Sequence, residues 1–113
     1  MFRRKAIRWP GNARVAITTC VVMESWPDDL GTAKSLQSEF RKGVPADAKF
    51  KRDIASITDR QYGERVGVYR VLDILKQEGV KASFFVNGYT VEAFPSIMKQ
   101  ITAEGHELCS ENW

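Results

Sequence analysis

The hydrophobic positions along the chain form short β-branched runs that are separated by stretches with helical spacing. The first run, RVAITTCVVM at residues 14–23, is almost continuously apolar, which is typical of a strand buried on both faces of a parallel sheet. A second run, at residues 81–86, is aromatic and β-branched and ends at the turn-forming pair Asn87-Gly88. Residues 106–111 form a weaker third extended segment. The pattern therefore predicts three strands.

The stretches that precede the second and third strands have the periodicity of amphipathic helices. Residues 62–78 place apolar side chains on one side and charged ones on the other, and Gly79 ends this pattern. After the second strand, Thr90 is a suitable N-cap for a helix that reaches Ala103, with Pro95 in an early turn where proline is tolerated. We therefore expect one helix in each connection.

Residues 24–60 show neither helical nor alternating periodicity, and they contain two prolines and two glycines. They are predicted to form a long loop, and loops of more than about 15 residues in compact domains usually cover a site or are disordered. The order is then strand, loop, helix, strand, helix, strand. It predicts an α/β fold in which three parallel strands are joined by two crossover helices.

In such folds the carboxyl ends of the strands meet at one edge of the sheet, where ligands bind. The residues that follow the three predicted strands are Glu24, Ser25 and Trp26 after the first, Asn87 and Gly88 after the second, and Glu111, Asn112 and Trp113 after the third. Glu24 and Glu111 could form a pair of acids of which one acts as a base, although acids at strand ends are more often solvated. The two tryptophans could stack on a sugar ring or plug the core, and the two asparagines offer further substrate contacts.

Length and charge limit the classes of protein to which the chain can belong. The chain has 113 residues, of which 43% are hydrophobic and 27% charged, so it forms at most one globular domain. The net charge of +3 comes from 17 basic and 14 acidic residues, and four of the basic residues lie at positions 3, 4, 5 and 8. Without these four the balance is 13 against 14, or −1. A basic cluster confined to one terminus argues against a nucleic-acid partner.

The N-terminal residues lack the apolar core of a secretory signal, and no apolar run is long enough to span a membrane. Cys20 and Cys109 lie in apolar stretches, where a buried free thiol is more common than a disulfide. These features predict a cytoplasmic protein without a membrane partner. His106, the only histidine, begins the third strand at the opposite edge of the sheet, so a structural role is favoured and no histidine cluster for zinc exists.

Three stretches together resemble the polysaccharide deacetylase (NodB homology) superfamily. They are Gln61–Arg70 with its Tyr-Gly-x-Arg-x-Gly pattern, Ala82–Val86, and Glu104–Trp113 with Gly-His-Glu-Leu at its start. More narrowly, the chain resembles the branch of the superfamily that includes metal-independent, allantoinase-like enzymes. In that branch, too, a helix with this start follows a long loop after the first strand. The resemblance covers roughly residues 9–113.

The resemblance implies a distorted (β/α) barrel and hydrolysis of carbon-nitrogen bonds other than peptide bonds, typically deacetylation of N-acetylated sugars in carbohydrate metabolism. Two alternatives stay open, a metal-independent hydrolase of cyclic amides or ureides and a non-catalytic relative. Because (β/α) barrels need about 200 residues or more, residues 1–113 would form the N-terminal part of a domain that is truncated at its C-terminal end. We expect this part alone to be inactive and prone to associate, with a homo-oligomer as one outcome.

The resemblance also implies roles for individual residues. The catalytic base of the family motif Thr-Phe-Asp-Asp falls on Glu24, and its metal-binding aspartate falls on Ser25. The first metal ligand of the motif His-x-x-x-His falls on Glu111, and the second would lie beyond Trp113. Because serine is a poor ligand, zinc or another divalent metal would meet a degenerate motif. The expected site is therefore metal-independent, with Glu24 as the base, Glu111 positioning or donating, and a carbohydrate or other small molecule as substrate.

Overall fold

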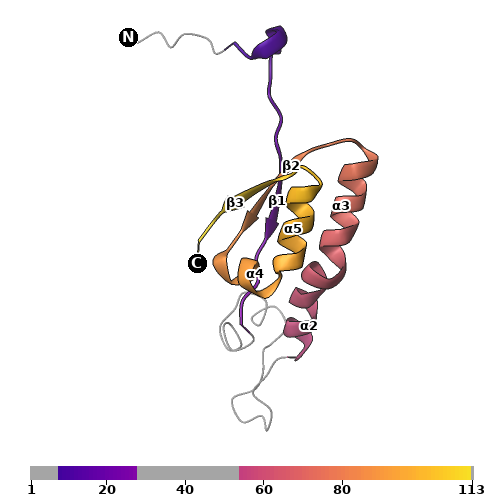
Figure 1. The fold of residues 1–113 in the computed structure, drawn as a ribbon, viewed down its shortest axis with the longest axis vertical. Coiled ribbons are helices and arrows are strands. Elements are labelled where there is room, and N and C mark those ends of the chain that lie inside the picture. Colours follow the sequence, from indigo (N-terminus) through magenta and orange to yellow (C-terminus); the bar gives the residue numbers. More distant parts are fainter. Residues whose placement is uncertain (1–7, 28–53, 113) are drawn as a thin grey trace.

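The computed structural model describes residues 8–27 and 54–112, which form a three-stranded parallel sheet covered by helices (Figure 1). The strands are β1 (Thr19–Met23), β2 (Ala82–Val86) and β3 (Glu107–Ser110), and they lie side by side in that order. The helical segments are η1 (Pro10–Asn12), α2 (Ile54–Tyr62), η2 (Gly63–Gly67), α3 (Val68–Gln77), α4 (Gly88–Ala93) and α5 (Pro95–Ala103). The predicted α/β fold with three parallel strands is confirmed.

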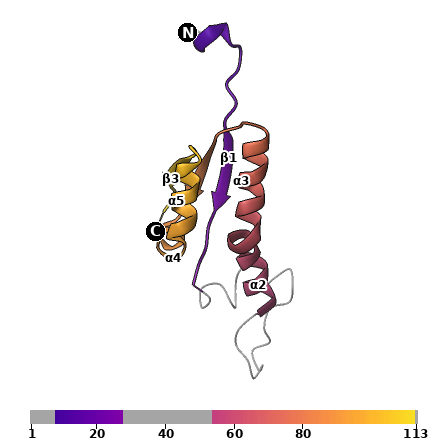
Figure 2. The same cartoon turned by 45° about the vertical axis from the view of Figure 1, so that its right-hand side comes forward.

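The core lies between one face of the sheet and helices α3 and α5, which both pack on that face (Figures 1 and 2). Strand alternation turns Phe84 of β2 toward the helices, where it is fully buried. Leu72 of α3 and Ile101 of α5 are its most deeply buried helical counterparts. The helix periodicity in the sequence therefore identifies the correct apolar faces.

The other side of the sheet, the open face, is formed by Cys20, Val22, Ser83, Phe85, Glu107 and Cys109. Val22 is 63% exposed, and both cysteines are free thiols, of which Cys20 is exposed and Cys109 is partly exposed. The predictions that the first strand is buried on both faces and that the cysteines are buried are thus wrong for the described residues. The physical reason is that none of the described helices packs on the open face.

The first strand is shorter than predicted. Residues 14–18 are extended but unpaired, and they lead away from the sheet toward the N-terminus (Figure 1). Since the pairing of β1 with β2 begins at Thr19 opposite Ala82, the residues before Thr19 have no neighbouring strand. Ile17 is accordingly 88% exposed despite its β-branched sequence context.

The long loop that was predicted for residues 24–60 ends earlier, because α2 already begins at Ile54. Residues 28–53 lie outside the described part of the chain. Ile57 of α2 is buried, which gives this helix an apolar anchor that the short periodic pattern did not reveal. The helix continues through the two glycines of η2, a π-helical segment, and joins α3.

The second connection contains two helices instead of one. Phe94 has φ −130° and ψ 55°, which ends α4, and Pro95 begins α5 at its first position. This break follows from proline, which disfavours a helical conformation in the preceding residue. The predicted N-cap Thr90 is also wrong, since the Asn87 side chain caps α4 by accepting a hydrogen bond from the Thr90 amide.

Candidate active site at the carboxyl edge of the sheet

The two predicted catalytic carboxylates lie at the same edge of the sheet. Glu24 follows the end of β1 and is half-buried, and Glu111 follows the end of β3 and is exposed. Partial burial raises the pKa of Glu24 above its ordinary value, and the negative charge of Glu111 and hydrogen bonding with its carboxyl raise it further. The fold therefore brings together two acids that are 87 positions apart in the sequence, residues 24 and 111.

The turn between β2 and α4 holds the end of β3. The Glu111 amide donates to the carbonyl of Val86 at 3.0 Å, and the Gly88 amide donates to the carbonyl of Asn112 at 2.8 Å. These bonds continue the β2–β3 pairing beyond the last strand residue. The backbone that carries the Glu111 side chain is thereby fixed on both sides.

The same turn holds the chain that leaves β1, through a ring of hydrogen bonds around Ser25. The Ser25 amide donates to the Thr90 hydroxyl at 2.8 Å, and the Asn87 side-chain amide donates to the Ser25 carbonyl at 2.9 Å. The ring is closed between the two side chains, because both the hydroxyl and the backbone amide of Thr90 donate to the Asn87 side-chain oxygen. We call these three residues, Ser25, Asn87 and Thr90, the clasp.

All three clasp residues are buried, Ser25 to 3% exposure, Asn87 to 2% and Thr90 to none. The hydroxyl oxygen of Ser25 is the one buried side-chain polar atom of the described residues that has no hydrogen-bond partner. Because buried polar groups are nearly always hydrogen-bonded, the position is costly for serine. The sequence pattern did not indicate that Thr90 is part of the site, because a threonine at the start of a predicted helix is already explained as an N-cap.

The residues that were predicted to contact substrate lie in different surroundings. Trp26 is 46% exposed next to Glu24, and Asn112 is exposed beside Glu111. Asn87 is at the predicted edge, but both functional groups of its amide are already bonded within the clasp. Trp113 lies outside the described residues.

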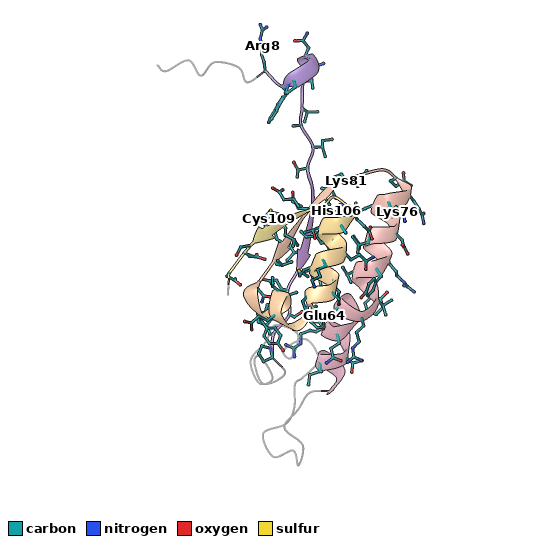
Figure 3. The ribbon with its side chains drawn as sticks, in the orientation of Figure 1. Arg8, Glu64, Lys76, Lys81, His106 and Cys109 are labelled. Carbon is teal, nitrogen blue, oxygen red and sulfur yellow. The ribbon has the colours of Figure 1, made fainter. Side chains whose placement is uncertain are left out.

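A cavity of about 270 Å³ opens beside Glu24, between β1 and the segment that joins α2 to α3. Its walls include apolar residues of β1 and α3, while Arg60 and Glu64 add charged groups to its lining. Glu64 lies at the end of the molecule toward which the strands point (Figure 3). Sequence reasoning missed both residues, because it assigned Arg60 to a loop and gave Glu64 no role. The Tyr-Gly-x-Arg-x-Gly pattern was the available signal, since it spans η2.

The donor set was tested against the divalent metal that the sequence resemblance implies. Within residues 8–27 and 54–112, no group of three or more His, Cys, Asp or Glu side chains could hold a metal ion. Glu24 and Glu111 supply two carboxylates, whereas a catalytic zinc needs about three protein ligands. The described residues alone do not fit a zinc site.

His106 lies at the opposite end of the strands, near Lys81 (Figure 3). It is buried, and its Nδ1 accepts a hydrogen bond from the Ala82 amide at 3.2 Å. The structural role that the sequence favoured is confirmed, although the partner is a strand amide. When the ring is neutral, this bond leaves the proton on Nε2.

The helices of the described residues include none that is long and apolar enough to cross a bilayer.

Comparisons with known proteins find stretches of similar sequence in several relatives. It is similar to a peptidoglycan-N-acetylglucosamine deacetylase of Bacillus cereus, with 54% identity over 39 residues that make up 34% of this chain and 14% of that protein. A peptidoglycan-N-acetylglucosamine deacetylase of Listeria monocytogenes is 46% identical over 43 residues, or 38% of this chain and 9% of that protein. A chitin deacetylase of Pestalotiopsis sp is 39% identical over 46 residues, or 38% of this chain and 15% of that protein. No solved structure matches the chain.

The aligned stretches thus span well under a quarter of the length of each of these relatives. The family comparison covers more of the chain, since polysaccharide deacetylases match residues 48–113. Glu24 lies before this range, so its prediction as the catalytic base depends on its position beside Glu111. Three parallel strands with helices between them agree with the N-terminal part of the (β/α) barrel that the resemblance implied. With more than half of its residues matched, the chain belongs to the polysaccharide deacetylase family.

Proposed function

We propose that the protein of which these residues form a part removes acetyl groups from N-acetylated amino sugars. The observation that carries the proposal is the interaction of Glu24 with Glu111 at the carboxyl edge of the sheet, in a chain of the polysaccharide deacetylase family. The named relatives support the substrate class, because they are deacetylases of peptidoglycan N-acetylglucosamine and of chitin. The bond that breaks is the carbon-nitrogen bond of the acetamide group.

In the proposed reaction Glu24 is the general base. Its carboxylate takes a proton from a water molecule, and the water oxygen forms a bond to the acetamide carbonyl carbon. The tetrahedral intermediate then expels the sugar nitrogen, which receives the proton from Glu24, so that the carbon-nitrogen bond breaks and an amine and acetic acid are formed; the acid then loses its proton to water and becomes acetate. The raised pKa makes the Glu24 carboxylate a stronger base than an ordinary glutamate. Glu111 maintains this basicity and helps to position the water.

Trp26 and Asn112 are the proposed substrate contacts among the described residues. Both are exposed next to the carboxylates, and an indole ring can stack on the apolar face of a sugar. We propose the same role for Trp113, because it follows Asn112 in the sequence. Binding of a chito-oligosaccharide should change tryptophan fluorescence in the wild-type chain and much less so in Trp26→Ala.

The proposal also includes a cytoplasmic location and a reaction that does not depend on a metal.

The deciding experiment replaces Glu24 in the parent protein and measures deacetylation of N-acetylglucosamine oligomers. Glu24→Gln removes the base but keeps the size of the side chain, so the rate should fall by about a hundredfold or more. Glu78→Gln is the matched control, since Glu78 is exposed at the C-terminal end of α3, before β2 begins, and this variant makes the same chemical change at the opposite end of the strands. An unchanged rate for Glu24→Gln would reject the proposed role of Glu24.

A parallel assay with allantoin separates the two kinds of carbon-nitrogen hydrolysis. Turnover of allantoin without turnover of acetylated sugars would replace the proposed substrate class with that of a ureide hydrolase. A wild-type parent protein that is inactive on both substrates would instead support a non-catalytic relative.

A further inference from the structure

We infer that Thr90 and Asn87 are positioning residues that hold Glu24 in place for the reaction by clamping the Ser25 peptide from both sides. This inference rests on the proposed function for the role of Glu24. It goes beyond that proposal because it assigns a task to two side chains that lie outside the carboxylate pair.

The pairing of β1 with β2 ends one residue before Glu24. The last paired residue of β1 is Met23, opposite Val86, so the strand gives Glu24 no further support. The next fixed point is Ser25, whose amide and carbonyl are both bonded by side chains of the β2–α4 turn. Glu24 therefore lies between two anchored neighbours, Met23 and Ser25, although it belongs to no strand.

One segment, residues 86–90, anchors the backbone beside both carboxylates. Val86 and Gly88 bind the backbone on either side of the Glu111 side chain, while Asn87 and Thr90 bind Ser25 next to Glu24. A single turn thus sets the distance between the strand ends that carry the two carboxylates. Catalytic groups must be held within a fraction of an ångström of their productive geometry, and such a turn provides the support.

The side chains of Asn87 and Thr90 have the hydrogen-bonding groups that the clasp requires. Asn87 uses its oxygen to accept from Thr90 and its NH₂ group to donate to Ser25, and an aspartate could not make this donation. Thr90 accepts from Ser25 and donates to Asn87, and valine has the same shape without either function. Because all three residues are buried, water cannot easily replace these bonds.

The test compares Thr90→Val with Thr90→Ser in the parent protein, and it measures amide hydrogen exchange together with kcat and KM. The Ser25 amide should exchange slowly in the wild type and in Thr90→Ser, and quickly in Thr90→Val. The value of kcat should fall by about tenfold to a hundredfold in Thr90→Val, with a smaller change in KM, and should recover in Thr90→Ser. Thr102→Val is the matched control, since the Thr102 hydroxyl bonds only carbonyls within α5.

Two outcomes overturn the inference. One is fast exchange of the Ser25 amide in the unaltered protein, and the other is a wild-type kcat in a folded Thr90→Val protein. If Thr90→Val does not fold, Asn87→Asp decides: it keeps an oxygen that can accept from Thr90, but it replaces the donor to the Ser25 carbonyl with a negatively charged acceptor, so it should lower kcat as well.

The variant Glu24→Gln separates this inference from the proposed function. If Glu24→Gln keeps full activity, the proposed function fails, whatever the exchange rates are. If Glu24→Gln is inactive while Thr90→Val retains the wild-type kcat, only the positioning inference fails.

Discussion

The surroundings of the Glu24 carboxyl group suit the role of base that we propose for it. Burial favours its protonated form, and the nearby charge of Glu111 acts in the same direction, so both effects raise its pKa above 4.5. A base must be deprotonated to work, so activity should be lost as the pH falls through this raised pKa. The acid limb of the pH profile therefore reports how strongly Glu111 acts on Glu24.

Replacing Glu111 with glutamine should move that limb to lower pH. Glu111→Gln removes a negative charge and a hydrogen bond that raise the pKa of Glu24, while the effect of burial remains. The limb should consequently stay above the ordinary range of a glutamate. The measurement is kcat/KM for an acetylated sugar as a function of pH, which reports the pKa of the free enzyme.

Glu107→Gln is the control for this profile. Glu107 lies on β3, and its carboxyl accepts a hydrogen bond from the Ser83 hydroxyl at 2.6 Å, but it is not among the groups that raise the pKa of Glu24. An acid limb that stays in place in Glu111→Gln, or that moves equally in Glu107→Gln, would contradict the assignment of Glu111.

At the scale of elements, two glycines with opposite backbone conformations predict opposite effects of alanine. Gly67 has helical angles, φ −59° and ψ −47°, and an added Cβ would lie 3.6 Å from the Tyr62 ring, an ordinary contact. Gly67→Ala should therefore stabilise the joined helices by roughly 0.5–1 kcal/mol. Gly105 has φ +78°, so Gly105→Ala should destabilise the α5–β3 turn by about 1–2 kcal/mol.

Urea denaturation of the two variants measures the free energy of unfolding, which should increase in Gly67→Ala and decrease in Gly105→Ala. Gly63→Ala is a useful third variant, because Gly63 lies in the same π-helical segment and a Cβ there would meet no atom within 4 Å. If Gly67→Ala destabilised the chain while Gly63→Ala did not, the contact with Tyr62 would be tighter than the structure shows.

The elements also show which features of the fold can be predicted from the sequence. Periodicity identified the three strands and the helical face that contains Leu72, because these signals are local and repeated. It failed at residues 14–18, since the burial of a β-branched run depends on whether a neighbouring strand reaches that far. It also missed the start of α2 at Ile54. The buried residue that marks this helix is Ile57, and a single apolar position does not make a periodic pattern.

Some features of the candidate site could also be predicted from the sequence, and others could not. The convergence of Glu24 and Glu111 could be predicted, because parallel strands end at a common edge. The clasp could not, since it depends on the place where the turn brings Thr90 relative to Ser25, 65 positions away in the sequence. Asn87 was selected for the correct edge, but its amide is engaged in bonds that no sequence pattern reveals.

For the molecule as a whole, the open face has a consequence for association. A folded domain rarely leaves a contiguous apolar sheet surface in water, and here Val22 is 63% exposed next to the half-buried ring of Phe85. The outer edge of β1 is unpaired among the described strands, which adds free backbone donors and acceptors beside this surface. The 113-residue chain on its own should therefore associate as its concentration rises.

A lysine on the open face should reverse this behaviour. Val22→Lys places a charge on the β1 side of the open face, which would be buried between associating copies, and burying an unpaired charge is strongly unfavourable. Ile74→Lys is the matched control, because Ile74 is 58% exposed on α3 and the same change there leaves the open face intact. Sedimentation velocity over a range of concentrations should show larger species for the unaltered chain and for Ile74→Lys, and monomers for Val22→Lys. If the unaltered chain stays monomeric throughout, the open face does not drive association; if both lysine variants are equally monomeric, net charge and not this surface controls it.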